Sequence, residues 1–582
     1  MGTKKEDYVL NIAKILIIIF VSIYLIGNFV PFYELPTSHY FAIASINFSE
    51  GIVSVTNELL ENTGRDEFVN SDWIKTPENE MIPKSSLGLI SAGALFYIIG
   101  GYSGLFYLSP ILAIITLIVS ERISTNLFGK YVGLFSLLFL ATNNLFFRNT
   151  IILRAESAFA LFFVLGSFFL VKFLREQKDY QILLASIFFA GSSFFRLNGI
   201  IAFPIEIGII IGFFVIKRIW RKKKISQREN QSGLFQLQIK KIIKTSILIS
   251  IPWIVFIMVY LGYFAYYTGD PFTTYLSYEG QERWYDTSPS SILNFEGKDF
   301  ENIKQFSQYL LPYQFPAVYD RIDENYESVL GGNWLGMISL VILSGICFLS
   351  LYTKNQRVII FTFLILIVST VWLLSTITLE ERASYGIGVP PRYMIPFFIL
   401  SSMMFGYLIT SILKVEAHET SRLNKNLIKG LKIGFAGILV IFFIGAFYFS
   451  PPIQMLTDDK EFKNPITYVE RYPVNSEGLV QNNVLLSRLD EKAMEYGLIP
   501  FNPYSKGNIT DESIDLLKNI ILDGYQVYTL KNSVNKIENK FFIDLIDNHG
   551  FSFIEYSDSF CKMQFENGKT TMNITDEVCI KR

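Results

Sequence analysis

Apolar residues in this chain gather in long blocks that charged residues separate. Blocks of about 17 to 25 residues have the length that a helix needs to cross about 30 Å of hydrocarbon. The first block runs from Tyr8 to Val30. Ten further spans are predicted at 103–121, 131–148, 156–174, 182–196, 199–217, 243–267, 333–352, 358–378, 393–413 and 433–449. We therefore expect an all-α polytopic membrane domain of about 11 transmembrane helices.

One more apolar run, Ser86 to Gly100, is short for a span, and the charge distribution decides whether to count it. Residues 217–241 are strongly basic and are predicted to be cytoplasmic, whereas residues 268–332 are rich in acids and are predicted to lie outside. With the N-terminus inside, both assignments require an even number of spans before residue 217. Leaving out 86–100 satisfies this condition, so we expect that run to be re-entrant or interfacial.

This topology describes an integral, multi-pass protein of the cell membrane with a cytoplasmic N-terminus. Its outer face carries a long first loop (31–102), a very short second loop (149–156), the acidic loop (268–332), a loop at 379–392 and residues 451–582. We therefore expect two domains, a transmembrane domain over 1–450 and an extracytoplasmic domain over 451–582. Any chemistry is expected on the outer face.

The C-terminal region no longer has a membrane pattern and alternates strand-like with helical periodicity. Strands are predicted at 483–489, 525–530 and 551–556, and helices at 511–523 and 535–548. Gly524 and Gly550 follow the two helices, where a left-handed residue commonly ends a helix. The pattern indicates a small α/β domain.

Composition agrees with a membrane protein and excludes one class of partner. The 582 residues are 51% hydrophobic, and mean hydropathy is +0.34. A formal net charge of -1 with three histidines gives no indication of nucleic-acid binding.

Acids and bases that could carry chemistry stand at the predicted outer ends of spans. Glu34 and His39 open the first loop, where they suit a general base and a phosphate partner, or are interfacial loop residues only. Lys84 precedes the short apolar run and either reaches a phosphate or snorkels to the surface. Arg154 and Glu156 make the short second loop dense in charge, although an acid at a helix start is often only a dipole partner.

Arg392, in the run Val389-Pro390-Pro391-Arg392-Tyr393, stands at the predicted outer end of the tenth span. A planar, always charged donor at that depth suits a phosphate, although the nearby acids Glu380 and Glu381 could simply neutralise it. Together, these residues place acids and bases where the phosphate of a membrane lipid would lie.

The order of these features resembles the GT-C glycosyltransferases, in the branch of protein O-mannosyltransferases, aminoarabinose transferases and related archaeal and bacterial enzymes. The resemblance covers residues 8–410 and rests on an ordered set rather than one diagnostic motif. The set comprises an acid-bearing first loop with the run Tyr40 to Ala44, a Pro/Lys turn into a half helix, Leu127-Phe128-Gly129, an acid heading the fourth span, and the run Arg392 to Pro396.

The resemblance implies transfer of a sugar from a polyprenyl- or dolichyl-phosphate donor to a protein, lipid or glycan acceptor on the outer face. A first-loop carboxylate would deprotonate the acceptor in an inverting reaction, and cations would stabilise the departing lipid phosphate. By position, Glu34 and Glu156 are the catalytic candidates, and His39, Lys84, Arg154 and Arg392 the candidates for substrate and phosphate binding. Neither a metal nor another cofactor is expected.

The sequence departs from the family pattern at the acid expected before the first-loop tyrosine, where it has Pro36 and Thr37. Glu34 either replaces that acid or activity is lost, and Asp66, Glu67 and Asp72 are a third possibility. The alternatives are therefore a catalytically impaired relative that binds lipid-linked glycan, a polymerase or ligase of such glycans, and a transporter. A transporter is disfavoured because the noted charges cluster at span ends.

Overall fold

A computed structural model gives the architecture. It describes residues 2–27, 36–65, 68–69, 73–83, 86–143, 146–147, 150–224, 231–271, 395–414, 422–448, 484–486, 499–501, 504–505, 508–509, 511–530, 545, 549, 551–555 and 560–565.

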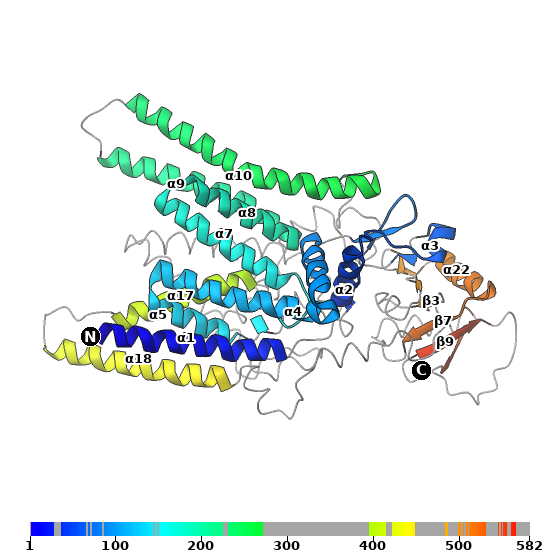
Figure 1. Ribbon diagram of the computed structural model, residues 1–582, viewed down its shortest axis with the longest axis horizontal. Helices are drawn as coiled ribbons and strands as arrows, with labels where there is room; N and C mark the ends of the chain where they lie inside the picture. Colours follow the sequence, from blue (N-terminus) through cyan, green and yellow to red (C-terminus); the bar gives the residue numbers. More distant parts are fainter. Residues whose placement is uncertain are drawn as a thin grey trace. The chain divides into compact units, whose positions relative to one another are not determined.

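The described part of the chain is mostly helical (Figure 1). Two predicted spans, 333–352 and 358–378, lie outside the described residues, and each of the others coincides with a helix. These helices are α1 (Gly2–Gly27), α4 (Leu87–Phe128), α5 (Lys130–Ala141), α7 (Glu156–Glu176), α8 (Asp179–Phe195), α9 (Ala202–Lys224), α10 (Gln231–Thr268), α17 (Ile395–Lys414) and α18 (Arg422–Tyr448).

Four of the described helices, α1, α4, α7 and α10, hold stretches that are long and apolar enough to cross a membrane. Shorter apolar helices lie at Lys130–Ala141, Ala202–Phe214 and Phe398–Leu413. The chain is therefore a membrane protein by the length and composition of its helices. The number of crossings and the side on which each terminus lies stay predictions.

Helix α5 is shorter than the span predicted at 131–148. It ends at Ala141, and the side-chain oxygen of Asn143 accepts the N–H of Phe146 at 2.9 Å. An asparagine that binds a backbone N–H three residues ahead offers the chain an alternative to the helix. The apolar pattern continued past this point, but the local hydrogen bond interrupts the helix.

The structure divides into two compact units, which are described separately. The first contains residues 1–30, 106–258 and 288–464, and the second contains 31–105, 259–287 and 465–582. The first unit is a helical bundle in which α5 contacts α1 and α17, and α7 contacts α8 and α17. The predicted boundary between residues 450 and 451 is not tested by this division and stays a prediction.

Glycines allow the helices of the bundle to approach closely. A Cβ on Gly406 of α17 would lie 2.8 Å from the Val132 carbonyl oxygen of α5. Likewise, a Cβ on Gly166 of α7 would lie 2.6 Å from the Phe189 ring of α8, and one on Gly191 of α8 would lie 2.8 Å from the Phe162 ring of α7. Small residues at such crossings are how helices associate in a membrane, where the apolar surroundings supply little hydrophobic driving force.

Helix α4 is bent near its middle. Gly101 has φ 59° and ψ −148°, a conformation that residues with a side chain rarely adopt. A Cβ on Gly104 would lie only 2.0 Å from the Phe96 carbonyl oxygen, so the backbone on the two sides of the bend is tightly packed. The short apolar run 86–100 is therefore joined to the predicted span at 103–121 through a glycine kink. Its place relative to the membrane stays a prediction.

The second unit combines pieces of the first loop with the C-terminal segment. The first loop contributes α2 (Pro36–Ser49), α3 (Glu58–Thr63) and an antiparallel pair of strands, β1 (Trp73–Lys75) and β2 (Met81–Pro83). The C-terminal segment contributes α22 (Asp511–Leu522) and a mixed sheet ordered β4-β3-β7-β9-β8. The strands of that sheet are β3 (Val484–Leu486), β4 (Ile499–Phe501), β7 (Val527–Leu530), β8 (Phe551–Glu555) and β9 (Phe560–Phe565).

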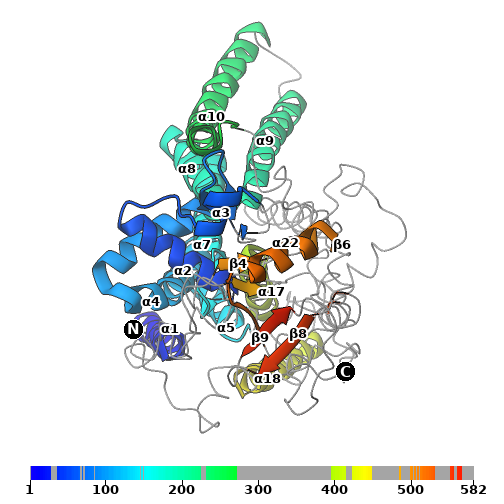
Figure 2. The same cartoon turned by 90° about the vertical axis from the view of Figure 1, so that its right-hand side faces the viewer.

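The C-terminal elements can be compared with the sequence pattern. The strands predicted at 483–489, 525–530 and 551–556 coincide with β3, β7 and β8, and the helix predicted at 511–523 coincides with α22. Gly524 has φ 97°, as expected of a glycine after a helix. The pattern missed β4 and β9, and β9 lies beside β8 in the sheet (Figure 2). The helix predicted at 535–548 falls almost wholly outside the described residues.

Within this unit, the first loop contacts the C-terminal segment. The rings of Phe68 and Phe501 have centroids 5.6 Å apart, and both side chains are fully buried. Asn57 caps the N-terminus of α3 and also donates to the Phe68 carbonyl at 3.1 Å, which fixes this aromatic residue relative to α3. Arg65 pairs with Glu512 of α22 at 3.2 Å. Segments more than 400 residues apart therefore share one small core.

We expect Gly406→Ala to destabilise the bundle by about 1–3 kcal/mol, because the added methyl group meets backbone atoms that cannot turn aside. The thermal unfolding of purified protein in detergent measures the change. Gly434→Ala in α18 is the matched control, since nothing lies within 4 Å of a Cβ there. Helix propensity favours alanine at that position, so equal stability of the two variants would contradict a close α5–α17 crossing.

Candidate functional site

The candidate site begins at the first residue of α7. Glu156 is 2% exposed and stands in the first turn of the helix, where the backbone N–H groups favour a negative charge. Its carboxylate forms an ion pair and hydrogen bond with the guanidinium of Arg196. The pair joins residues that are 40 positions apart in the chain.

A tight turn after α8 brings Arg196 to this position. Arg196 leaves the helix in an extended conformation, with φ −149° and ψ 119°, while its N–H still donates to the Ser192 carbonyl at 3.0 Å. The N–H of Gly199 closes the turn by donating to the Arg196 carbonyl at 2.8 Å. A Cβ on Gly199 would lie 2.8 Å from the Ser192 hydroxyl, so a glycine suits the crowded turn. The short 3-10 helix η3 (Leu197–Ile201) then leads into α9.

The two members of the pair differ in exposure. The side chain of Glu156 is 3% exposed and that of Arg196 is 17% exposed. The guanidinium is therefore the more accessible member of the pair. A buried carboxylate that is hydrogen-bonded to arginine is poorly suited to take a proton from a substrate, but it holds the planar guanidinium in a fixed orientation.

Arg154 lies two residues before Glu156 and is anchored by its backbone. Its N–H donates to the hydroxyl of Ser109 on α4 at 3.2 Å, and that hydroxyl donates in turn to the Arg154 carbonyl at 3.3 Å. Ser109 is fully buried. The segment before α7 is therefore held against α4. Arg154 is close to Glu156 in the chain, and Arg196 is close to it in space.

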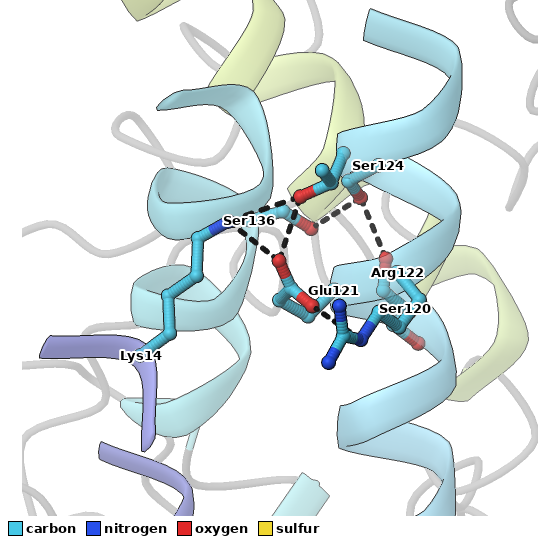
Figure 3. Close-up of polar contacts among 7 residues, drawn as sticks. Lys14, Ser120, Glu121, Arg122, Ser124 and Ser136 are labelled. Carbon is cyan, nitrogen blue, oxygen red and sulfur yellow. Dashed lines mark hydrogen bonds and ion pairs between the residues drawn. The ribbon is translucent and has the colours of Figure 1, made fainter. Parts of the chain in front are cut away.

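A second buried ion pair links α1 to α4 (Figure 3). Lys14 donates to the Glu121 carboxylate at 2.6 Å and to the Thr125 hydroxyl at 3.0 Å. Thr125 also donates to the same carboxylate oxygen at 2.6 Å, and the exposed Arg122 approaches the other oxygen at 3.6 Å. The side chains of Lys14 and Glu121 are 7% and 6% exposed, so this pair is buried within the bundle.

Small residues of α5 and α17 complete this cluster. A Cβ on Gly133 would lie 2.1 Å from the Thr125 hydroxyl, so a glycine lets α5 pass beside the ion pair. One turn away, Ser124 donates to Ser136 of α5 at 3.1 Å, and Ser136 lies 3.2 Å from Ser402 of α17. Polar contacts therefore connect α1, α4, α5 and α17 within the bundle.

Most of the predicted site residues lie outside the described residues. Glu34 falls between α1 and α2, Lys84 between β2 and Ser86, and Arg392 three residues before α17. Asp66, Glu67 and Asp72 also lie outside. His39 is part of α2, but its side chain is not described. Of the predicted set, the structure describes the side chains of Arg154 and Glu156, which are two positions apart in the chain. The roles assigned to all of these residues stay predictions.

Sequence reasoning missed three residues that the structure makes prominent. The apolar pattern includes Arg196 as the last residue of the span predicted at 182–196. It includes Lys14 within the first span and Glu121 at the end of the span predicted at 103–121. Their signal was a charged residue within an apolar block, which favours a buried partner on another helix. A transporter was disfavoured because the noted charges cluster at span ends. Lys14 weakens that argument, because it lies within a predicted span.

The similarity comparisons give distant structural relatives only. No protein-family model and no curated protein sequence matches the chain. Among solved structures, the oligosaccharyltransferase AglB from Archaeoglobus fulgidus, in complex with an inhibitory peptide and a dolichol-phosphate, is 11% identical with a TM-score of 0.49. That alignment covers 98% of this chain and 76% of AglB. ArnT from Cupriavidus metallidurans, bound to undecaprenyl phosphate, is 11% identical with a TM-score of 0.46, over 96% of this chain and 98% of ArnT.

Another structure of the Archaeoglobus fulgidus oligosaccharyltransferase, in complex with Zn and sulfate, is 12% identical with a TM-score of 0.43. It covers 94% of this chain and 72% of that protein. All three TM-scores lie below 0.5, so the functional proposal rests on the residues of this chain.

We expect Lys14→Met to lower the free energy of unfolding by about 3–5 kcal/mol, because it leaves the Glu121 charge buried without its lysine. The double variant Lys14→Met/Glu121→Met is expected to recover most of that loss, since neither charge remains. Chemical or thermal unfolding in detergent measures both variants.

The exposed pair of Lys130 and Asp7, with an N–O distance of 2.6 Å, serves as the control for this cycle. Lys130→Met is expected to cost at most about 1 kcal/mol, because water already solvates both charges. A Lys14→Met variant as mild as Lys130→Met, or a double variant worse than the single one, would show that the buried pair does not hold α1 against α4.

Proposed function

We propose that this protein is a membrane glycosyltransferase of the GT-C class, which moves a sugar from a polyprenyl- or dolichyl-phosphate donor to an acceptor on the outer face of the membrane. The observation that carries the proposal is the buried pair of Glu156 and Arg196 at the head of α7. Glu156 stands where the family resemblance places the acid of the second loop, and a second arginine, Arg154, lies two residues before it in the chain. Four described helices are long and apolar enough to cross a membrane, which is also where a lipid-linked donor resides.

In this proposal, Glu156 acts through Arg196 rather than on the acceptor. The carboxylate fixes the guanidinium, and the guanidinium binds the lipid phosphate through its planar set of N–H donors. Negative charge grows on that phosphate as the bond to the sugar breaks, so a preorganised cation lowers the barrier. This assigns Glu156 a positioning role, in place of the catalytic role expected from the sequence.

The general base is then a carboxylate of the first loop, and Glu34 is the first candidate. It would accept the proton of the acceptor hydroxyl or amine while the acceptor attacks the anomeric carbon from the side opposite the phosphate, which inverts the configuration. His39, Lys84 and Arg392 are proposed to contact donor or phosphate. The acceptor class, whether protein, lipid or glycan, is left to experiment.

Two other functions have a specific observation in their favour. Pro36 and Thr37, at the positions where the family has its acid, favour an impaired relative that binds the lipid phosphate without transferring the sugar. The buried Lys14 and Glu121 favour a transporter, because charged groups on facing membrane helices are typical of ion and substrate paths. Both are distinct outcomes of the transfer experiment.

Reconstituted into liposomes with a panel of radiolabelled dolichyl-phosphate sugars, the wild type is expected to transfer label from at least one donor. Glu34→Gln is expected to lower that rate by about 10²-fold or more, because the amide cannot accept the proton. Glu176→Gln, an acid at the far end of α7, is the control and is expected to retain activity. No transfer with lipid phosphate still bound would identify the impaired relative, and uptake of a solute without transfer would identify the transporter.

Arg196→Lys tests the phosphate role separately. A lysine keeps the charge but loses the planar fork, so we expect weaker donor binding, measured as a rise in KM for the lipid-phosphate sugar. Glu156→Gln is expected to act in the same direction, because it releases the guanidinium from its orientation. A normal KM for the donor in both variants would contradict a phosphate role for the pair.

We expect transfer to continue undiminished after dialysis against EDTA, because the proposed chemistry uses side-chain cations at the phosphate. Activity lost with EDTA and restored by a divalent ion would contradict the metal-independent mechanism. Mg²⁺, Mn²⁺ and Zn²⁺ are the ions to add back.

A further inference from the structure

A third buried acid lies on α9, apart from the two ion pairs. Glu206 is fully buried, the fifth residue of a helix that contacts α7 and α8. One carboxyl oxygen accepts the hydroxyl of Ser186 on α8 at 2.6 Å. The other accepts the indole N–H of Trp253 on α10 at 3.3 Å. Both donors are neutral, and both are buried.

The surroundings of Glu206 are apolar. The ring of Trp253 packs against Phe203 with centroids 5.2 Å apart and against Phe256 at 6.1 Å. Ile205, one residue before Glu206, is buried as well. Among the described residues, two hydrogen bonds from neutral donors replace the water that this carboxyl group loses on burial.

Five cations near Glu206 in the chain or on the neighbouring helices have other partners. Arg196 pairs with Glu156, Lys244 of α10 with Asp179 of α8, and Lys178 with Glu176. Lys241 donates to Gln177 at 2.6 Å, and Lys172 of α7 lies over the ring of Phe168 at 4.7 Å. Within the described part of the chain, the structure records no cation in an ion pair with Glu206.

The three buried acids among the described residues of the bundle therefore fall into two kinds. Glu121 and Glu156 each have a cation within ion-pair distance, whereas the partners that the described residues give Glu206 are a hydroxyl and an indole. An ionised carboxylate buried without a counter-charge is strongly disfavoured, and the group avoids that cost when it binds a proton instead. A protonated carboxyl has a carbonyl oxygen that still accepts a hydrogen bond and an O–H that can donate to the serine oxygen.

We propose that Glu206 is a proton-binding site in the membrane bundle, at which α8, α9 and α10 meet around a neutral carboxylic acid. Its ligand is the proton itself, and Ser186 and Trp253 are the groups that hold the protonated side chain in place. The site is independent of glycosyl transfer. It would exist equally in a transferase, an impaired relative or a transporter.

Infrared spectroscopy tests the proposal, because a carboxylic acid and a carboxylate have separate stretching bands. The protein is measured at neutral pH in a maltoside detergent, which has no ester carbonyl to overlap the acid band. The difference spectrum of wild type minus Glu206→Gln is expected to contain the C=O band of one protonated acid. Glu121→Gln is the matched control, and its difference spectrum is expected to contain carboxylate bands instead.

Carboxylate bands in the Glu206→Gln difference spectrum would overturn the proposal. If Glu206→Gln does not fold, as judged by circular dichroism, the Ser186→Ala variant tests the proposal instead, because it keeps Glu206 and removes one hydrogen-bond partner of its carboxyl group. Removal of the serine hydroxyl is expected to move the acid band to higher frequency, because the carboxyl loses a hydrogen bond. A spectrum of Ser186→Ala in which no acid band moves would also overturn the proposal.

Discussion

The high cost of an unpaired charge inside a membrane governs the arrangement of the helical bundle. A charged side chain at the centre of a spanning helix costs about 2.5–3.5 kcal/mol on insertion scales, and buried charges are therefore paired or neutralised. Two ion pairs meet this demand: Lys14 with Glu121 joins α1 to α4, and Glu156 with Arg196 joins the head of α7 to the turn after α8. Glu206 accepts hydrogen bonds from neutral donors instead, and for this reason its side chain is proposed to be protonated.

Close contact between helices makes these pairs possible. Gly133 leaves room for the carboxylate and hydroxyl of the Lys14 cluster, and Gly406 brings α17 against the backbone of α5. In the same way, Gly199 permits the tight turn that carries Arg196 to the head of α7. In hydrocarbon, packing and polar contacts must provide the helix association that the hydrophobic effect provides in water. Each glycine stabilises this association because it lets neighbouring atoms approach closely.

The second unit has its own link between distant segments. Phe68 from the first loop and Phe501 from the C-terminal segment share a buried core, and Asn57 fixes Phe68 by a hydrogen bond to its carbonyl. The first loop also contains Glu34, the proposed base, so its contacts with the C-terminal segment are a means of steadying the loop to which the base is assigned. The prediction of a separate outer domain did not anticipate this contact, because neither aromatic residue stands out within its own segment.

The sequence by itself determined the apolar helices, since each needs only a block of apolar residues long enough for the bilayer. It also located four C-terminal elements, α22, β3, β7 and β8, and the glycine that ends α22. Local chemistry limited even this, as at Asn143, where one side-chain hydrogen bond ends α5 before its apolar block ends. The sequence also identified Glu156 and Arg154 as a dense charged loop. Only the tertiary structure decided that Glu156 pairs with Arg196, that Lys14 pairs with Glu121, and that Glu206 pairs with no cation among the described residues. The physical reason is that a charged residue within an apolar block is visible in the sequence and indicates that a partner is needed. Which residue becomes the partner depends on which helices pack together.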